Sequence, residues 1–253
     1  MSSVVNKITD FLRVFSPKEQ RRYFTSAIIL AAGSGERFGN ENGRKQFFDI
    51  AGVPAVVRSL RTFEASEYIH EIILVTGKDD VERCEEYKKE YSLTKISKIL
   101  PGGADRQASV KIGFDAISPN ARFVAIHDGV RCLVTEDIIK STVRAAYEHG
   151  AAVAAEKCRD TVKRASVAGV VEESPDRSAI WLAKTPQIFL SDMYRAAVYT
   201  AENDHVRATD DSMLVERIGF KVHVVDCGSE NIKITVPIDV QIAEAILKAR
   251  GEE

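Results

Sequence analysis

Glycines and basic residues lie close together in one segment of the chain, "AIILAAGSGERFGNENGRKQF". An apolar stretch leads directly to Gly33, Gly35 and Gly39, with the cations Arg37 and Lys45 close by. Glycines let the backbone approach a ligand closely, and bare N–H groups together with cations suit an anion. The segment therefore predicts an anion site, which leaves open which anion binds.

The spacing of these glycines differs from the two best-known nucleotide-binding fingerprints. The order Gly33-x-Gly35-x-x-x-Gly39 is not the G-x-G-x-x-G of dinucleotide sites, and no Gly-Lys-Ser/Thr follows, as a P-loop requires. On spacing alone, a structural turn explains the segment about as well as a phosphate site. Arg37 and Lys45 favour the phosphate site, because their length and charge let them reach over a triphosphate.

The composition excludes several classes of function. With 253 residues, 45% of them hydrophobic, the chain is long enough for one large core. A net charge of −2 gives no general attraction to nucleic acid or membranes, and no apolar run approaches the roughly 20 residues of a membrane span. The four cysteines form no C-x-x-C pair, which argues against a thiolate zinc site and fits a reducing compartment. We expect a cytoplasmic protein that binds neither nucleic acid nor membranes.

Apolar and polar segments alternate in a way that predicts strands and helices in turn. Strands are expected at 26–32, 71–77, 95–100 and 122–128, and helices at 53–65, 79–91, 106–117 and 135–150. This alternation implies an α/β fold with a mostly parallel sheet and helices on both faces. Ligands bind beyond the carboxyl ends of such strands, so residues 33–45, 102–106 and 128–131 should share one rim.

Residues 157–179 interrupt this alternation. They contain short β-like pieces, a turn at Gly169 and a Ser-Pro-Asp break, which predict a two-stranded hairpin that protrudes from the sheet. A solvent-exposed hairpin without a function remains the alternative. Against it, Thr161 and Arg177 belong to a dense set of polar side chains on this β-arm.

Seven segments in order make the chain resemble the 2-C-methyl-D-erythritol 4-phosphate cytidylyltransferases of non-mevalonate isoprenoid synthesis, over about residues 26–247. They are "LAAGSGERFG…RKQF", "PGGADRQASV", "IHDGVR", "CRDTVKR", "KTPQIF", "ATDDSMLVERIGF" and "ENIKITVPIDVQIAEAIL". The resemblance implies a Rossmann-like fold of the nucleotide-diphospho-sugar transferase type. It also implies transfer of CMP from CTP to the sugar phosphate, giving 4-diphosphocytidyl-2-C-methyl-D-erythritol and pyrophosphate. Two alternatives are a ribitol-5-phosphate cytidylyltransferase for cell-envelope polymers and a catalytically silent nucleotide-binding domain.

The resemblance also implies roles for individual residues. The catalytic positions are Arg37 and Lys45, which stabilise charge at the α-phosphate, and Arg177 and Lys233, which position the acceptor phosphate. The CTP-binding positions are Ala31, Ala32, Gly33, Gly103, Arg106, Ser109, Asp128 and Gly129. The sugar-phosphate positions are Arg131, Thr161, Thr185 and Thr209. The expected cofactor is Mg²⁺, held mainly by triphosphate oxygens and by Asp128.

The residues agree with this reaction in one respect. The sequence contains no recognisable nucleophile–base pair, and none is needed, because the attacking phosphate oxygen is already ionised near pH 7. Five positions depart from the usual family pattern, namely Arg44, Ala104, Gly129, Cys132 and Lys184. None of these departures removes a charge that the chemistry requires.

Residues 1–24 lie outside the resemblance. Apolar side chains recur at helical spacing in "SSVVNKITDFLRVF", which predicts an amphipathic helix that packs on the body or on a partner, with binding to a membrane surface as the alternative. We expect this extension to precede one cytidylyltransferase domain at 25–253. The resemblance further implies a homodimer with exchanged arms, in which Thr161 and Arg177 reach the pocket of the other subunit.

Overall fold

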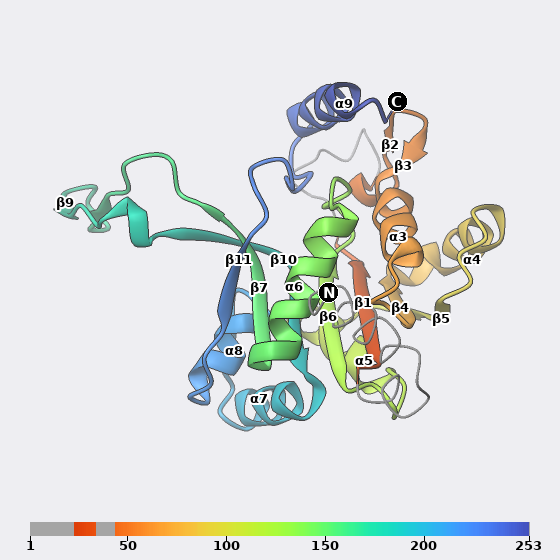
Figure 1. Cartoon of the computed structure of the whole chain (residues 1–253), viewed down its shortest axis with the longest axis horizontal. Helices are drawn as coiled ribbons and strands as arrows, with labels where there is room; N and C mark the ends of the chain where they lie inside the picture. The colour runs from red at the N-terminus through yellow and green to blue at the C-terminus, as the bar shows by residue number, and fades with distance from the viewer. Residues whose placement is uncertain (1–22, 34–43, 253) are drawn as a thin grey trace, which may run out of the picture.

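The computed structural model describes residues 23–33 and 44–252, and its centre is a seven-stranded sheet (Figure 1). The strand order is β11-β7-β10-β6-β1-β4-β5. The strands are β1 (Thr25–Ala31), β4 (Glu71–Thr76), β5 (Ile96–Pro101), β6 (Phe123–Asp128), β7 (Ala151–Lys157), β10 (Trp181–Leu190) and β11 (His223–Asp226). Strand β10 pairs antiparallel with β6 and β7, whereas the other neighbouring strands are parallel. The predicted mostly parallel sheet is confirmed.

Helices cover both faces of this sheet, as predicted. One face carries α3 (Ala55–Ala65), α4 (Val81–Glu90) and α6 (Glu136–His149), and the other carries α5 (Arg106–Asp115), α7 (Ser191–Asn203) and α8 (Asp211–Arg217). Within β1, Ala27 and Ile29 belong to the first core, and Ile28 and Leu30 belong to the second. Because successive side chains of a strand point to opposite faces, a strand buried on both faces reads as one apolar run.

A third, smaller core lies beyond the carboxyl ends of the strands. Helix α9 (Ile238–Arg250) packs there against the hairpin of β2 (Asp49–Ile50) and β3 (Val53–Pro54). Cys132 is buried in this core, and burial raises the pKa of its thiol to about 12. Three short 3-10 helices are η3 (Lys45–Phe47), η4 (Lys78–Asp80) and η5 (Arg177–Ala179).

Helix α6 begins and ends as its sequence predicts. The Thr135 hydroxyl accepts a hydrogen bond from the Ile138 N–H at 3.3 Å and so caps the first turn. At the other end Gly150 has φ = 87°, a left-handed conformation that glycine adopts without steric cost. The Thr135 cap and the left-handed Gly150 therefore mark the two ends of this helix.

The arm leaves the sheet between β7 and β10 and extends away from the body in Figure 1. Its tip pairs β8 (Arg164–Ala165) with β9 (Val171–Glu173), and Gly169 turns the chain between them with φ = 79°. The predicted β-arm is confirmed. The arm starts at the carboxyl end of β7. Because β10 runs opposite to β6 and β7, the arm also returns to the sheet at this edge, where both of those strands have their carboxyl ends.

The predicted N-terminal helix within residues 1–24 lies outside the described residues. Among the helices that are described, none combines the length and the apolar character that a membrane crossing requires.

Candidate active site

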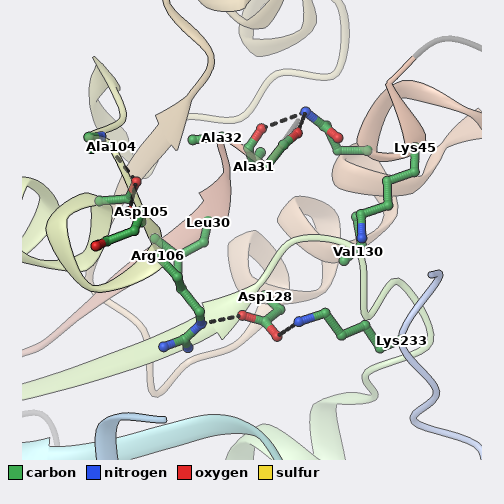
Figure 2. A pocket seen from close by; sticks show the side chains of 14 residues that line it. Leu30, Ala31, Ala32, Lys45, Ala104, Asp105, Arg106, Asp128, Val130 and Lys233 are labelled. Atoms are coloured by element: carbon green, nitrogen blue, oxygen red, sulfur yellow. Dashed lines mark hydrogen bonds and ion pairs between the residues drawn. The ribbon is translucent and has the colours of Figure 1, made fainter. Parts of the chain in front are cut away.

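A cavity of about 480 Å³ opens at the carboxyl edge of the sheet (Figure 2). The described parts of the three segments predicted to share a rim meet there, with Gly33 and Lys45 from the first of them. Its lining residues are Leu30, Ala31, Ala32, Gly33, Lys45, Gln46, Gly103, Ala104, Asp105, Arg106, Ser109, Asp128, Val130 and Lys233. The volume is in the range of small-molecule sites. Arg37 lies outside the described residues, so its predicted role stays a prediction.

The end of β1 is held in place by the side-chain amide of Gln46. Its Nε2 donates to the carbonyl oxygens of Ala31 at 2.8 Å and Gly33 at 3.2 Å, and the residue is only 1% exposed. These two bonds fix the orientation of the peptides at which the glycine segment starts. Sequence reasoning assigned Gln46 no function, because an amide within "RKQF" gives no sign that it will be buried.

Glycines 102 and 103 allow two backbone segments to approach closely beside the cavity. A Cβ on Gly102 would lie 2.4 Å from the Cβ of Ala32, and one on Gly103 would lie 2.6 Å from the Cβ of Ala108. Ser109 joins the two ends of this turn, since its Oγ accepts from the Gly103 N–H at 3.1 Å and donates to the Asp105 carbonyl at 2.8 Å. Small residues are therefore required at this turn, and Ala32, Gly103 and Ser109 form this side of the cavity lining.

The N-terminus of α5 faces the cavity. Asp105 caps it by accepting a hydrogen bond from the Ala108 N–H at 2.8 Å, and Arg106 is the first helical residue. A helix N-terminus favours an anion through its free N–H groups and its dipole. Asp105, which follows the unusual Ala104, therefore has a structural duty as a cap.

Asp128 lies among three cations at the end of β6. Its Oδ1 is 3.2 Å from Arg106 Nε, its Oδ2 is 2.7 Å from Lys233 Nζ, and Arg131 Nε is 3.9 Å away (Figure 2 shows the first two contacts). Burial alone would raise the pKa of this carboxyl, but Arg106 and Lys233 together hold it well below its usual range. The carboxylate stays ionised and neutralises the cations around it.

Thr185 of β10 holds the backbone of Asp128 by a hydrogen bond. Its Oγ1 accepts a hydrogen bond from the Asp128 N–H at 3.1 Å and lies 3.0 Å from His127 Nδ1. Burial lowers the pKa of His127 to about 3, so the ring is neutral at physiological pH. Asn231 links Thr185 to the segment that carries Lys233, because its amide donates to the Thr185 carbonyl at 2.9 Å.

A second carboxylate, which is buried and does not line the cavity, also binds Arg106. Asp211, at the start of α8, accepts from Arg106 Nη1 at 2.8 Å and from the Tyr194 hydroxyl at 2.6 Å. The neighbouring Asp210 is the N-cap of this helix and accepts a hydrogen bond from the Met213 N–H at 3.1 Å. Asp211 was missed, because the sequence does not reveal which of two adjacent aspartates turns inward.

Six predicted site residues are not among the lining residues of the cavity that the described residues form. Thr161 and Arg177 are exposed on the arm, where Arg177 Nη1 donates to the Arg159 carbonyl at 2.9 Å. Thr209 is exposed before α8, and Gly129 is buried, with its N–H donating to the Leu30 carbonyl at 2.8 Å. Arg131 and Thr185 adjoin the cavity through their contacts with Asp128.

The two unusual basic residues pair with carboxylates of their own. Lys184 Nζ lies 2.8 Å from Glu156 Oε2 and also donates to the carbonyls of Gly228 and Ser229. Arg44 pairs with Asp80. Both departures from the family pattern therefore serve local structure in the chain.

Comparisons with known proteins agree with the resemblance. The sequence profile of 2-C-methyl-D-erythritol 4-phosphate cytidylyltransferases matches residues 25–249. A protein of that name from Syntrophus aciditrophicus is 43% identical over 223 residues, which cover 88% of this chain and 95% of the relative. Another from Caldanaerobacter subterraneus subsp. tengcongensis is 40% identical over 224 residues, covering 88% and 98%.

Solved structures lead to the same family. The crystal structure of 4-diphosphocytidyl-2C-methyl-D-erythritol synthase from Anaerococcus prevotii has a TM-score of 0.79 at 32% identity, and the match covers 89% of this chain and 98% of that one. The cytidylyltransferase structure from Thermus thermophilus has a TM-score of 0.73 at 28% identity, covering 89% and 99%. The chain belongs to the 2-C-methyl-D-erythritol 4-phosphate cytidylyltransferase family, a family of nucleotidyltransferases.

Proposed function

We propose that this protein transfers the cytidylyl group of CTP to 2-C-methyl-D-erythritol 4-phosphate in non-mevalonate isoprenoid synthesis. An oxygen of the acceptor phosphate bonds to the α-phosphorus of CTP, the bond from that phosphorus to the bridging oxygen breaks, and pyrophosphate leaves. The observation that carries the proposal is the charge arrangement of the cavity. Within the described residues Lys45, Arg106 and Lys233 line it around the ionised Asp128, as a site for two polyanions requires.

The reaction needs no general base. A phosphate monoester is largely dianionic near pH 7, since its second pKa is about 6, so the attacking oxygen carries no proton that must be removed. His127 is buried and neutral, and its ring supports the Asp128 loop through Thr185. Catalysis then consists of aligning two anions that repel each other and neutralising the charge that develops between them.

The cavity has a nucleotide side and an acceptor side. The side of the cavity lined by Ala32 and Gly103, with the N-terminus of α5 and Arg106, suits the cytidine and its triphosphate. Lys233 reaches Asp128 from a different segment, and an arriving acceptor phosphate can take the place of that carboxylate as its partner. Lys45 lines the space between the two sides, where charge builds up at the α-phosphate. The role of Arg37 rests on the resemblance.

The donor set suits Mg²⁺ when the triphosphate supplies most of the ligands. No group of three or more potential ligand side chains occurs within the described part of the chain. Asp128 presents an ionised carboxylate to the cavity, and Mg²⁺ commonly binds through one or two carboxylates together with substrate phosphates. Asp128 would hold the ion, and the ion would neutralise part of the negative charge on the phosphates.

Two subunits complete each site in this proposal. The arm carries Thr161 and Arg177 away from the cavity of its own chain and exposes Val167, Val170 and Val171. A two-stranded hairpin is marginal in water unless something covers it. A homodimer with a two-fold axis would cover both arms and bring each Arg177 to the acceptor side of the other subunit. Thr209, near the Asp210 cap, would line the same side.

The reaction can be tested directly by measuring pyrophosphate release from CTP. We expect release only when CTP, Mg²⁺ and 2-C-methyl-D-erythritol 4-phosphate are all present, with mixtures that lack one component as controls. Ribitol 5-phosphate serves as the competing acceptor. Equal or faster release with ribitol 5-phosphate would reassign the substrate, and no release with either acceptor would contradict the proposed activity.

A further inference from the structure

We infer that Asp211 is a positioning residue for CTP, because it holds Arg106 in place from the protein side while Asp128 engages ligands. The inference rests on the proposed function, since it concerns the nucleotide side of the same site. Asp211 itself is not among the described residues that line the cavity, so it acts through Arg106.

Arg106 bridges two carboxylates that differ in their access to the cavity. Its Nε faces Asp128 at 3.2 Å and its Nη1 faces Asp211 at 2.8 Å. The side chain of Asp128 is 10% exposed and lines the cavity, whereas that of Asp211 is 2% exposed and lies behind Arg106. A ligand can therefore reach the first carboxylate but not the second.

Asp211 is fixed by bonds that a ligand does not touch. The hydroxyl of Tyr194 donates to its Oδ1 at 2.6 Å, and its own N–H donates to Gln187 Oε1 at 3.1 Å. Tyr194 is 1% exposed and lies against Phe114 of α5 and Phe189 of β10, with ring centroids at 5.0 and 5.3 Å. Tyr194 of α7 thus holds the carboxylate of Asp211, and Gln187 of β10 holds its backbone N–H.

This arrangement has a physical consequence for ligand binding. When Mg²⁺ or a ribose hydroxyl engages Asp128, Arg106 loses part of its attraction to that carboxylate. An arginine with no second partner would then be free to rotate, and ordering it again would weaken binding. Asp211 keeps one edge of the guanidinium fixed in both situations.

A purely structural role for Asp211 is the alternative. The cap of α8 is already supplied by Asp210, which accepts from the Met213 N–H. Asp210 is therefore a matched control: it is the neighbouring residue, it has the same chemistry, and its bonds go to α8 and Gln187.

The test compares Asp211→Asn with Asp210→Asn. For Asp211→Asn we expect the Kd of CTP in the presence of Mg²⁺, measured without acceptor, to rise by about 10–100-fold, the range for losing a charged hydrogen bond. The KM for the acceptor should change by less than about twofold, because Asp211 acts on the nucleotide side of the site through Arg106. Asp210→Asn should leave the Kd of CTP within about twofold of wild type even if it melts at a lower temperature.

A double-mutant cycle separates positioning from a general loss of structure. In an Arg106→Ala background, Asp211→Asn should raise the Kd of CTP by less than about twofold, because the residue through which Asp211 acts is gone. Full additivity of the two changes would overturn the inference, as would wild-type CTP affinity in folded Asp211→Asn protein.

Tyr194→Phe covers the case in which Asp211→Asn does not fold. It removes the 2.6 Å hydrogen bond to Asp211 and keeps the ring, and we expect the Kd of CTP to rise about 3–10-fold. An unchanged Kd in this folded variant would equally overturn the inference. Because CTP binding is measured without acceptor, a wild-type protein that binds CTP but releases no pyrophosphate refutes the proposed reaction and leaves this comparison valid.

Discussion

Lys45→Ala should lower the turnover number for cytidylyl transfer by about 10²–10³-fold, the scale for removing one donor that stabilises transition-state charge. Lys45 is the first residue of η3 and lines the cavity between the β1 end and Lys233. The short helix itself is anchored by Gln46 and Phe47, which are buried or packed against the core. We therefore expect the melting temperature to change little. Initial rates at saturating CTP and acceptor, with a thermal melt of the same sample, measure both quantities.

Lys78→Ala is a matched control for this variant. Lys78 is also the first residue of a three-residue 3-10 helix after a strand of the sheet, but it is exposed and is not among the described lining residues. Its replacement should leave turnover unchanged. A large fall in the melting temperature of Lys45→Ala with only a modest loss of rate would show that Lys45 is structural.

Mixing two inactive variants should restore about a quarter of wild-type activity if the site is shared between subunits. Lys45→Ala removes a cation from the cavity, and Arg177→Ala removes one from the exposed arm. In a mixed dimer with exchanged arms, one site carries both defects and the other carries neither. Random pairing makes about half of the dimers mixed, so about one site in four is intact.

The experiment is to unfold the two variants together, refold the mixture and measure pyrophosphate release. Each variant refolded alone gives the baseline, and native mass spectrometry of the mixture counts the mixed dimers. If Lys45 and Arg177 served the same cavity within one chain, every site would carry a defect. Activity at the sum of the two baselines, despite mixed dimers, would therefore refute the shared site.

Local signals were sufficient to predict much of the fold. Strand β1 reads as an apolar run because both of its faces are buried, and α6 is bounded by Thr135 and Gly150. The direction of β10 could not be predicted in the same way. It depends on pairing with β6 and β7, which are more than 20 residues away in the chain, and its register even shifts between Ala183 and Gln187.

The site residues likewise fall into those that local motifs predict and those that depend on tertiary contacts. Arg106, Asp128 and Lys233 were expected from motifs, and the structure brings their charged groups into contact. Gln46 and Asp211 were not expected, because their importance comes from burial and from partners far along the chain. A buried amide or carboxylate looks like any surface residue until the tertiary contacts are known.

The reversed direction of β10 has a consequence for how chains with this architecture can diverge. The arm is the connection between two adjacent antiparallel strands, so residues can be added to it or removed from it without shifting the strands that carry Asp128 and Thr185. Loop length costs little free energy, and surface connections tolerate insertions. In the proposed homodimer, acceptor preference and subunit geometry can therefore evolve through one insertion point, independently of the strands that carry the proposed nucleotide site.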